Sequence, residues 1–164
     1  MLELSWFVRR DHDDLNYALR VMTESTDECE VEQMLDRVRR KFPAHAEAEV
    51  MALGAMLEKT QPPPSLYFLV SQVIASHLAQ ETVLGQLLAQ EVGTPALRER
   101  ARYLRQLMVH HADHEAACLH PALPDHLPRP IYRTLGTSYA MERDRILDDQ
   151  RKLACLEPLI ARSA

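Results

Sequence analysis

Residues 104–119 read LRQLMVHHADHEAACL, and this stretch decides the fold because it combines a helical apolar pattern with a histidine and a carboxylate in the same phase. Its apolar positions recur at intervals of three and four residues, the period of a helix with one buried face. His111 and Glu115 continue that pattern where it calls for apolar side chains. The pattern therefore predicts that both side chains face the interior, one helical turn apart.

Three other stretches repeat this arrangement. In residues 31–56 a second histidine–glutamate pair with the same spacing falls in the core phase, and residues 8–22 and 66–88 each place one histidine there. The six residues in phase are His12, His45, Glu49, His77, His111 and Glu115. Burying so many polar groups costs free energy unless a partner satisfies them. A pair of metal ions is the simplest such partner, since bundle interiors hold metals between facing helices.

The pattern predicts an all-α protein. Four helices joined by short turns favour an up-down-up-down four-helix bundle over residues 4–122. The sequence predicts three helix starts. These are a capping box formed by Ser25 and Glu28, an N-cap at Ser65, and an N-cap at Thr94 followed by Pro95 in the first helical position. We expect a kink or restart at Pro43, and a loop in the proline-rich residues 121–130. A further helix over residues 131–153 gives a C-terminal extension, residues 128–160, within a single domain, residues 1–164.

Composition excludes several classes of partner. The chain has 164 residues, 46% hydrophobic residues and a formal net charge of -5, which argues against nucleic acid as a main partner. No apolar run reaches the ~18 residues that span a bilayer, so no membrane role is expected. The N-terminus lacks a signal-peptide core. Cys29, Cys118 and Cys155 form no CxxC motif, which favours a reduced, cytoplasmic location, with Cys118 a buried thiol or a ligand.

The ligand set itself favours two ions. Residues i and i+4 lie on one helix face, so a histidine and a carboxylate at that spacing can reach the same ion or two neighbouring ions. Imidazole binds iron, zinc, copper and nickel, and a carboxylate can bridge two cations and offset their charge. Four imidazole nitrogens and two carboxylates suit a dinuclear centre better than a single ion.

These motifs resemble the hemerythrin-like family, in its cation-binding branch with the order H, HxxxE, H, HxxxE. The closest local match is the run from His111 to Pro121, which is similar to the family's HxxxE(E)xxLFP. The segments His45-Ala-Glu-Ala-Glu49, Asp11-His12-Asp13 and Ser76-His77-Leu78 match the other three motifs. The resemblance covers residues 5–122.

The resemblance implies a non-haem di-iron centre, usually with an oxo or hydroxo bridge. His12, His45, His77 and His111 would be terminal ligands, and Glu49 and Glu115 would be bridges. Two features depart from the family. Val50 and Ala116 replace the second glutamate that often follows each HxxxE motif. The longer histidine-to-aspartate spacing of the oxygen carriers is absent, which disfavours reversible oxygen transport.

Several polar residues near the motifs keep more than one interpretation. Glu81 follows His77 by one turn and is either a seventh metal ligand or a solvated residue at the edge of the stripe. His110 and His114 read as flanking residues, with His114 a candidate to orient a ligand. His120 and His126, at or beyond the helix end, read as solvated residues. The tyrosines read as packing residues, and nothing in the sequence selects one that would contact the centre.

The sequence supports more than one function. The first hypothesis is a di-iron protein that reacts with or senses O2, NO or peroxide, with zinc or manganese as alternative metals. The second is an iron-responsive regulatory module, or one for iron storage or donation, without turnover. Its protein partner is not identified by the sequence. A metal-free bundle with hydrogen-bonded core histidines is the plainest alternative.

Overall fold

The computed structural model describes residues 3–161, with side chains described for residues 3–154. Every element in this part of the chain is helical, which confirms the all-α prediction. The elements are α1 (Leu4–Glu24), α2 (Glu28–Thr60), α3 (Pro64–Leu88), α4 (Pro95–His114), the π-helix η1 (Glu115–Leu119), α5 (His120–His126) and α6 (Arg129–Ala161).

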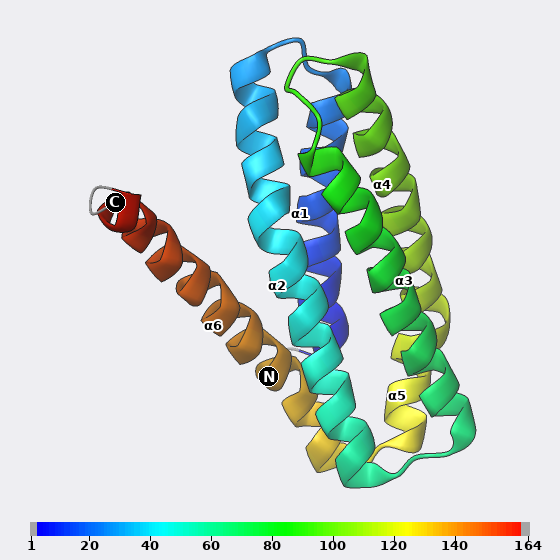
Figure 1. Ribbon diagram of the computed structural model, residues 1–164. Helices are drawn as coiled ribbons and strands as arrows, with labels where there is room; N and C mark the ends of the chain where they lie inside the picture. The colour runs from blue at the N-terminus through cyan, green and yellow to red at the C-terminus, as the bar shows by residue number, and fades with distance from the viewer. Residues whose placement is uncertain (1–2, 162–164) are drawn as a thin grey trace.

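The first four helices lie side by side (Figure 1). α1 packs against α2 and α4, and α3 packs against α4 and α2, so the four helices surround a common interior. α6 packs against α2 and α1. The later part of α6 extends away from the other helices (Figure 1).

The helix starts follow the predicted signals in part. Thr94 caps α4 as predicted, because its hydroxyl oxygen accepts a hydrogen bond from the backbone N–H of Leu97 at 3.2 Å. At α2 the capping residue is Asp27, whose carboxylate accepts from the N–H of Cys29, so the predicted capping box is wrong there. α3 begins at Pro64 without a side-chain cap, and the predicted cap at Ser65 is also wrong.

Prolines interrupt the helices less than predicted. α2 continues as one helix through Pro43, without a restart. The segment predicted as a loop contains α5, which follows η1 and α4 without a break. Pro121 lacks an N–H and its ring would clash with the carbonyl four residues back in a regular α-helix. The turn before it is a π turn, in which the N–H of His120 bonds to the carbonyl of Glu115, five residues back.

The apolar core consists of two clusters that lie on either side of the histidine layer. On α1, Leu4 and Val8 belong to one cluster and Leu15 to the other, with His12 between them. On α3, His77 likewise follows residues of the first cluster and precedes residues of the second. The polar layer is therefore enclosed by apolar packing at both ends.

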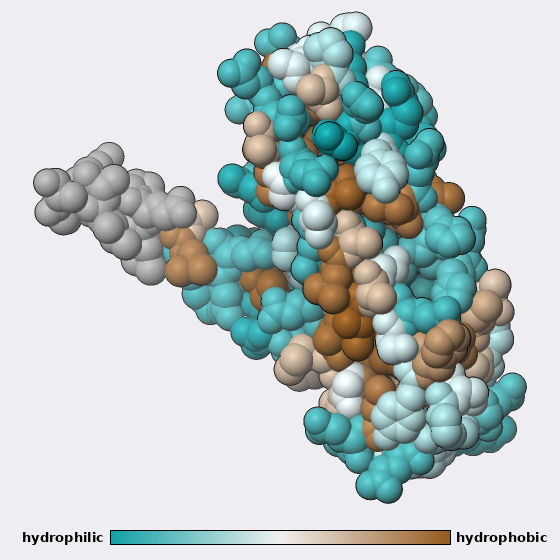
Figure 2. All heavy atoms as spheres, turned by 45° about the vertical axis from the view of Figure 1, so that its right-hand side comes forward, coloured by the Kyte–Doolittle hydropathy of each residue, from teal (hydrophilic) through white to brown (hydrophobic). Residues whose placement is uncertain are grey.

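The surface is mixed in character. A band of hydrophobic residues runs along the face shown in Figure 2, with hydrophilic residues on both sides. Among the described residues, no helix is both long enough and apolar enough to cross a bilayer. Cys29 and Cys118 are exposed, so the prediction of a buried Cys118 is wrong. The side chain of Cys155 lies outside the described residues.

Candidate metal centre

Four helices each deliver one imidazole to the same level of the interior. His12 comes from α1, His45 from α2, His77 from α3 and His111 from α4, and all four side chains are buried. The four imidazoles form a closed circle. Their centroids are 4.6 Å apart for His12 and His45, 5.4 Å for His45 and His77, 4.7 Å for His77 and His111, and 5.2 Å for His111 and His12. The histidines predicted from the helical period therefore converge.

The imidazole nitrogens form two close pairs. The Nε2 atoms of His12 and His45 are 3.1 Å apart, and those of His77 and His111 are also 3.1 Å apart. Two nitrogens bound at right angles to one ion, at about 2.1 Å each, are about 3 Å apart. Each pair thus has the separation expected of two ligands on one ion.

The two glutamates lie between these pairs. Glu49 Oε2 is 3.7 Å from His45 Nε2 and 3.6 Å from His77 Nε2, so its carboxylate faces one imidazole of each pair. The Glu115 carboxylate also faces one imidazole of each pair. Its Oε1 atom is 3.1 Å from His111 Nε2, and its Oε2 atom is 3.9 Å from His12 Nε2. Both carboxylates are therefore placed to bridge the two candidate ion positions.

The buried carboxylates have no hydrogen-bonding partner within the protein. All four oxygens of Glu49 and Glu115 are buried and without a hydrogen bond, as is Nδ1 of His77. Native interiors rarely leave such groups unpaired, because each unpaired group costs about 1–3 kcal/mol or more. The ligand atoms of His45, Glu49, His77 and His111 lie within 4.8 Å of one another, as do those of His12, His111 and Glu115. This donor set fits metal ions.

Burial keeps the metal-free site electrically neutral. Desolvation raises the pKa of Glu115 to about 8 and that of Glu49 well above its ordinary value, and the charge of Glu115 adds to the latter shift. Burial lowers the pKa of His77 to about 3 and that of His45 well below its ordinary value. Neutral imidazoles are ready to bind a metal, whereas the carboxyl groups must first lose their protons.

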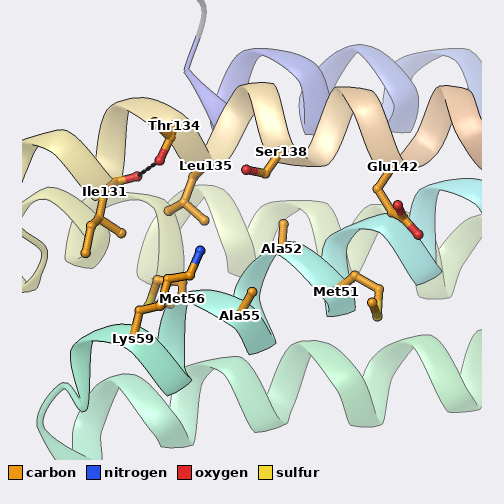
Figure 3. A pocket seen from close by; sticks show the side chains of 10 residues that line it. All are labelled: Met51, Ala52, Ala55, Met56, Lys59, Ile131, Thr134, Leu135, Ser138 and Glu142. Carbon is orange, nitrogen blue, oxygen red and sulfur yellow. Dashed lines mark hydrogen bonds between the residues drawn. The ribbon is translucent and has the colours of Figure 1, made fainter.

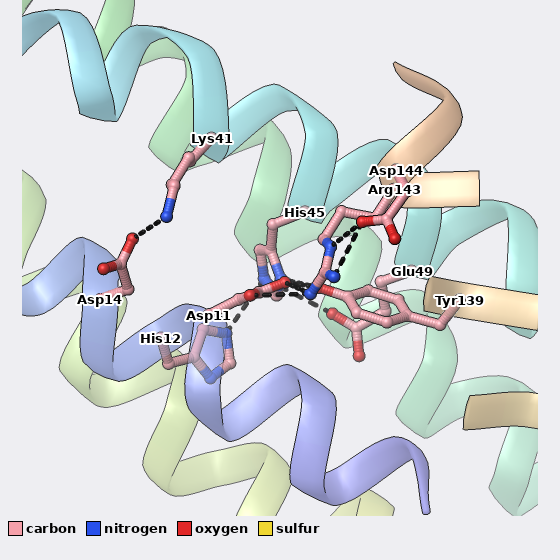
Figure 4. Close-up of polar contacts among 9 residues, drawn as sticks. All are labelled: Asp11, His12, Asp14, Lys41, His45, Glu49, Tyr139, Arg143 and Asp144. Atoms are coloured by element: carbon pink, nitrogen blue, oxygen red, sulfur yellow. Dashed lines mark hydrogen bonds and ion pairs between the residues drawn. The ribbon is translucent and has the colours of Figure 1, made fainter. Parts of the chain in front are cut away.

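A hydrogen-bonded chain from α6 fixes the orientation of one imidazole (Figure 4). Tyr139 is fully buried, and its hydroxyl lies 2.8 Å from His45 Nδ1 and donates to Asp11 Oδ2 at 2.5 Å. Because the hydroxyl hydrogen goes to Asp11, His45 Nδ1–H is the donor to the tyrosine oxygen, which leaves the Nε2 lone pair free for a metal. Arg143 donates to the same Asp11 carboxylate at 3.0 Å.

Glu81, predicted as a possible seventh ligand, is exposed and lies outside the cluster. The next buried position after His77 on α3 is occupied by Gln80, which is 1% exposed. A period of 3.6 residues alternates steps of four and three, and after His77 the step is three. The interpretation of Glu81 as a solvated residue is the one that agrees with the structure.

The remaining histidines separate into two kinds. His110 is exposed and His114 is partly buried, and neither has a ligand atom among the converging groups. His120 was predicted to be solvated, and this is wrong. Its Nε2 atom is buried without a hydrogen-bond partner, and one of its ring nitrogens lies within 4.8 Å of carboxylate oxygens of Glu49 and Glu115. A strict α-helical period places this residue off the side that carries His111 and Glu115, so the periodicity contains no signal for it.

Several hollows lie along these helices, and one of them reaches a candidate ligand. A pocket of about 150 Å³ between α1 and α4 is lined by His12, Asp13 and Ala112, among others, and so reaches one candidate ligand. A larger groove of about 260 Å³ lies between α2 and α6 (Figure 3), with Lys59 and Glu142 among its lining residues. That groove contains none of the converging histidines and glutamates.

Comparisons of the chain with protein-family models, curated proteins and solved structures find no match. The geometry of the buried His/Glu cluster shows that it could bind a metal ion.

Proposed function

We propose that the protein is a hemerythrin-like, non-haem di-iron protein that reacts with or senses O2, NO or peroxide. In this proposal α1–α4 are an up-down-up-down four-helix bundle. His12 and His45 hold one iron, His77 and His111 hold the other, and both glutamates bridge the pair. The observation that carries the proposal is the pairing of the Nε2 atoms at 3.1 Å, with a buried carboxylate between the pairs on each side.

The number of ligands supports a reactive site rather than a purely structural one. Two imidazoles and two shared carboxylates give each ion four protein ligands, fewer than the six that iron commonly takes. Open positions distinguish reactive metal sites from structural ones. Bound iron would supply the ability to bind a small oxidant and to exchange electrons with it.

Access to the site is consistent with a small ligand. The pocket between α1 and α4 reaches His12, which is the most exposed of the four histidines at 6%. A pocket of about 150 Å³ is below the usual range for organic ligands, about 300–1,000 Å³, and is large enough for a few water-sized molecules. Asp13 and Asp113 line the same pocket and would attract an incoming cation.

The proposal is tested by metal content and by reactivity. Protein purified without a histidine tag should contain about two irons per chain by mass spectrometry, with an oxo-to-iron charge-transfer band in its optical spectrum. Stopped-flow mixing with peroxide or NO should change that band. His77→Ala and His111→Ala should each reduce the metal content, while exposed His126→Ala should not. Zinc or manganese at two per chain would contradict the iron assignment, and no bound metal would contradict the site.

A regulatory function is the second candidate, and the contact between Tyr139 and His45 favours it. Because α6 contacts a metal-binding residue directly, metal binding at His45 would also stabilise the docking of α6 against α2. Limited proteolysis with and without iron distinguishes the two candidates. Protection of α6 by iron without peroxide or NO turnover favours regulation or iron storage, and turnover favours the reactive site.

A further inference from the structure

His120 is the one histidine near the cluster whose position the four-helix pattern does not explain. Its side chain is partly buried, but Nε2 is fully buried and has no hydrogen-bond partner. A ring nitrogen of His120 lies within 4.8 Å of carboxylate oxygens of Glu49 and Glu115, and these oxygens are also without partners. Three buried polar groups therefore lie close together without a hydrogen bond that satisfies them.

The π-helix η1 accounts for this position. In a regular α-helix each residue turns by about 100°, so His120 would be turned about 140° away from Glu115. In a π-helix the hydrogen bond joins residues i and i+5, which then lie on one side of the helix as residues i and i+4 do in an α-helix. Glu115 and His120 are such a pair, joined by the hydrogen bond between their backbone groups. The wide turn brings the imidazole to the metal-facing side, and π turns occur frequently at functional sites.

We propose that Nε2 of His120 is a seventh protein ligand of the metal pair, on the side of the two bridging carboxylates. This inference rests on the dinuclear site proposed above. It makes the two ions unequal, because one gains a third imidazole and the other keeps its open positions. A small ligand would then bind at only one ion.

The chemical state of His120 agrees with this role. A deprotonated imidazole is uncharged and offers the lone pair of its unprotonated nitrogen to a metal. A neutral ligand also suits the charge of the site, where two carboxylates already offset part of the metal charge. Imidazole is a common ligand of first-row metals.

Cobalt(II) titration of the full chain tests the proposal, since bound Co²⁺ reports its ligands by visible absorption. Wild-type protein should bind two Co²⁺ ions. His120→Ala should weaken one of them by at least about tenfold and should change its visible spectrum. Added imidazole should fill the vacated space and so restore both the Co²⁺ affinity and the visible spectrum. His126→Ala, at an exposed position in the same helix, should match the wild type.

His120→Phe keeps an aromatic ring without a ligand nitrogen, so it separates loss of ligation from loss of packing. It should show the same weakened ion as His120→Ala, with unchanged far-ultraviolet circular dichroism. An unchanged Co²⁺ affinity in both variants would overturn the proposal, as would a weakened ion with an unaltered spectrum and no rescue by imidazole. If the wild type binds fewer than two Co²⁺ ions, the dinuclear site itself fails.

Discussion

The hydroxyl of Tyr139 lies 2.8 Å from Nδ1 of His45, although 94 residues separate the two in sequence. The contact links α6 to the centre of α2. Tyr139 is held in turn by the Asp11 carboxylate, and Arg143 neutralises that carboxylate. Partners of this kind set the tautomer and orientation of a metal-binding imidazole. α6 is therefore part of the candidate metal site as well as a packing element.

Tyr139→Phe should weaken metal binding by about 10–100-fold, because His45 loses the acceptor that fixes its tautomer. The apo-protein should remain folded, since the ring still fills its place in the core. Competition with a fluorescent chelator measures the change. Tyr103→Phe is the matched control, because Tyr103 is exposed. Equal affinities of the two variants would contradict the assigned role.

Metal affinity should rise with pH up to about 8. Below that pH the Glu115 carboxyl, with its pKa raised to about 8 by burial, must release a proton before it can bind a metal. Each released proton makes the affinity about tenfold stronger per pH unit. Glu49, whose pKa is also raised, adds to the slope. Calorimetry in buffers of different ionisation enthalpy counts the released protons, and a pH-independent affinity would contradict buried, protonated carboxyls.

The metal-free protein should be most stable near pH 6.5. As the pH rises above that value, the unfolded chain has ionised Glu49 and Glu115 while the folded chain keeps their protons, so stability falls until the pH reaches about 8. As the pH falls below 6.5, the unfolded chain protonates four histidines that the folded chain keeps neutral, His12, His45, His77 and His120. These outnumber the two carboxyl groups, which act in the opposite direction, so stability falls again. Chemical denaturation across pH 5–9 measures this, and a monotonic profile would contradict it.

Glu49→Gln should affect the two forms of the protein in opposite directions. The apo-protein should gain stability at pH 8, because a buried carboxyl no longer ionises on unfolding alone. The metal-loaded protein should lose one or both ions, because an amide is a poor bridge between two cations. Thermal melts with and without iron measure both effects. Glu47→Gln, at an exposed position two residues away, should change neither.

Glu81→Ala should leave metal content, optical spectrum and peroxide reactivity unchanged. The Glu81 side chain is exposed and outside the cluster, so it blocks no coordination position. A rise in reactivity toward peroxide or NO would instead support the alternative in which Glu81 closes the site. Optical titration and stopped-flow kinetics compare the variant with the wild type.

The helical period predicted the helices and most of the cluster because both depend on one repeating pattern. His12, His45, His77 and His111 replace apolar residues in four amphipathic stripes, and burial of those stripes brings them together. The same period misplaced Glu81. A helix with 3.6 residues per turn does not specify whether the next buried position lies three or four residues further along the chain.

The rest of the site depends on features that the period does not carry. His120 reaches the carboxylates only through a π turn, which breaks the phase used for prediction. Tyr139 reaches His45 through the docking of α6, and sequence patterns do not specify which face of one helix meets another. The proline-rich segment was predicted as a loop because prolines usually end helices, whereas here Pro121 begins a new one after the wide turn.

The five-residue turn Glu115–Leu119 also constrains the length of the chain at this point. Deleting one residue from it would restore a regular α-helix and rotate everything that follows by about 100°. His120 would then leave the carboxylates, and the chain would enter α6 in a different direction, away from the contact with His45. A substitution at the exposed positions Ala116, Ala117 or Cys118 keeps the length of this turn, so insertions and deletions are the changes that the segment tolerates least.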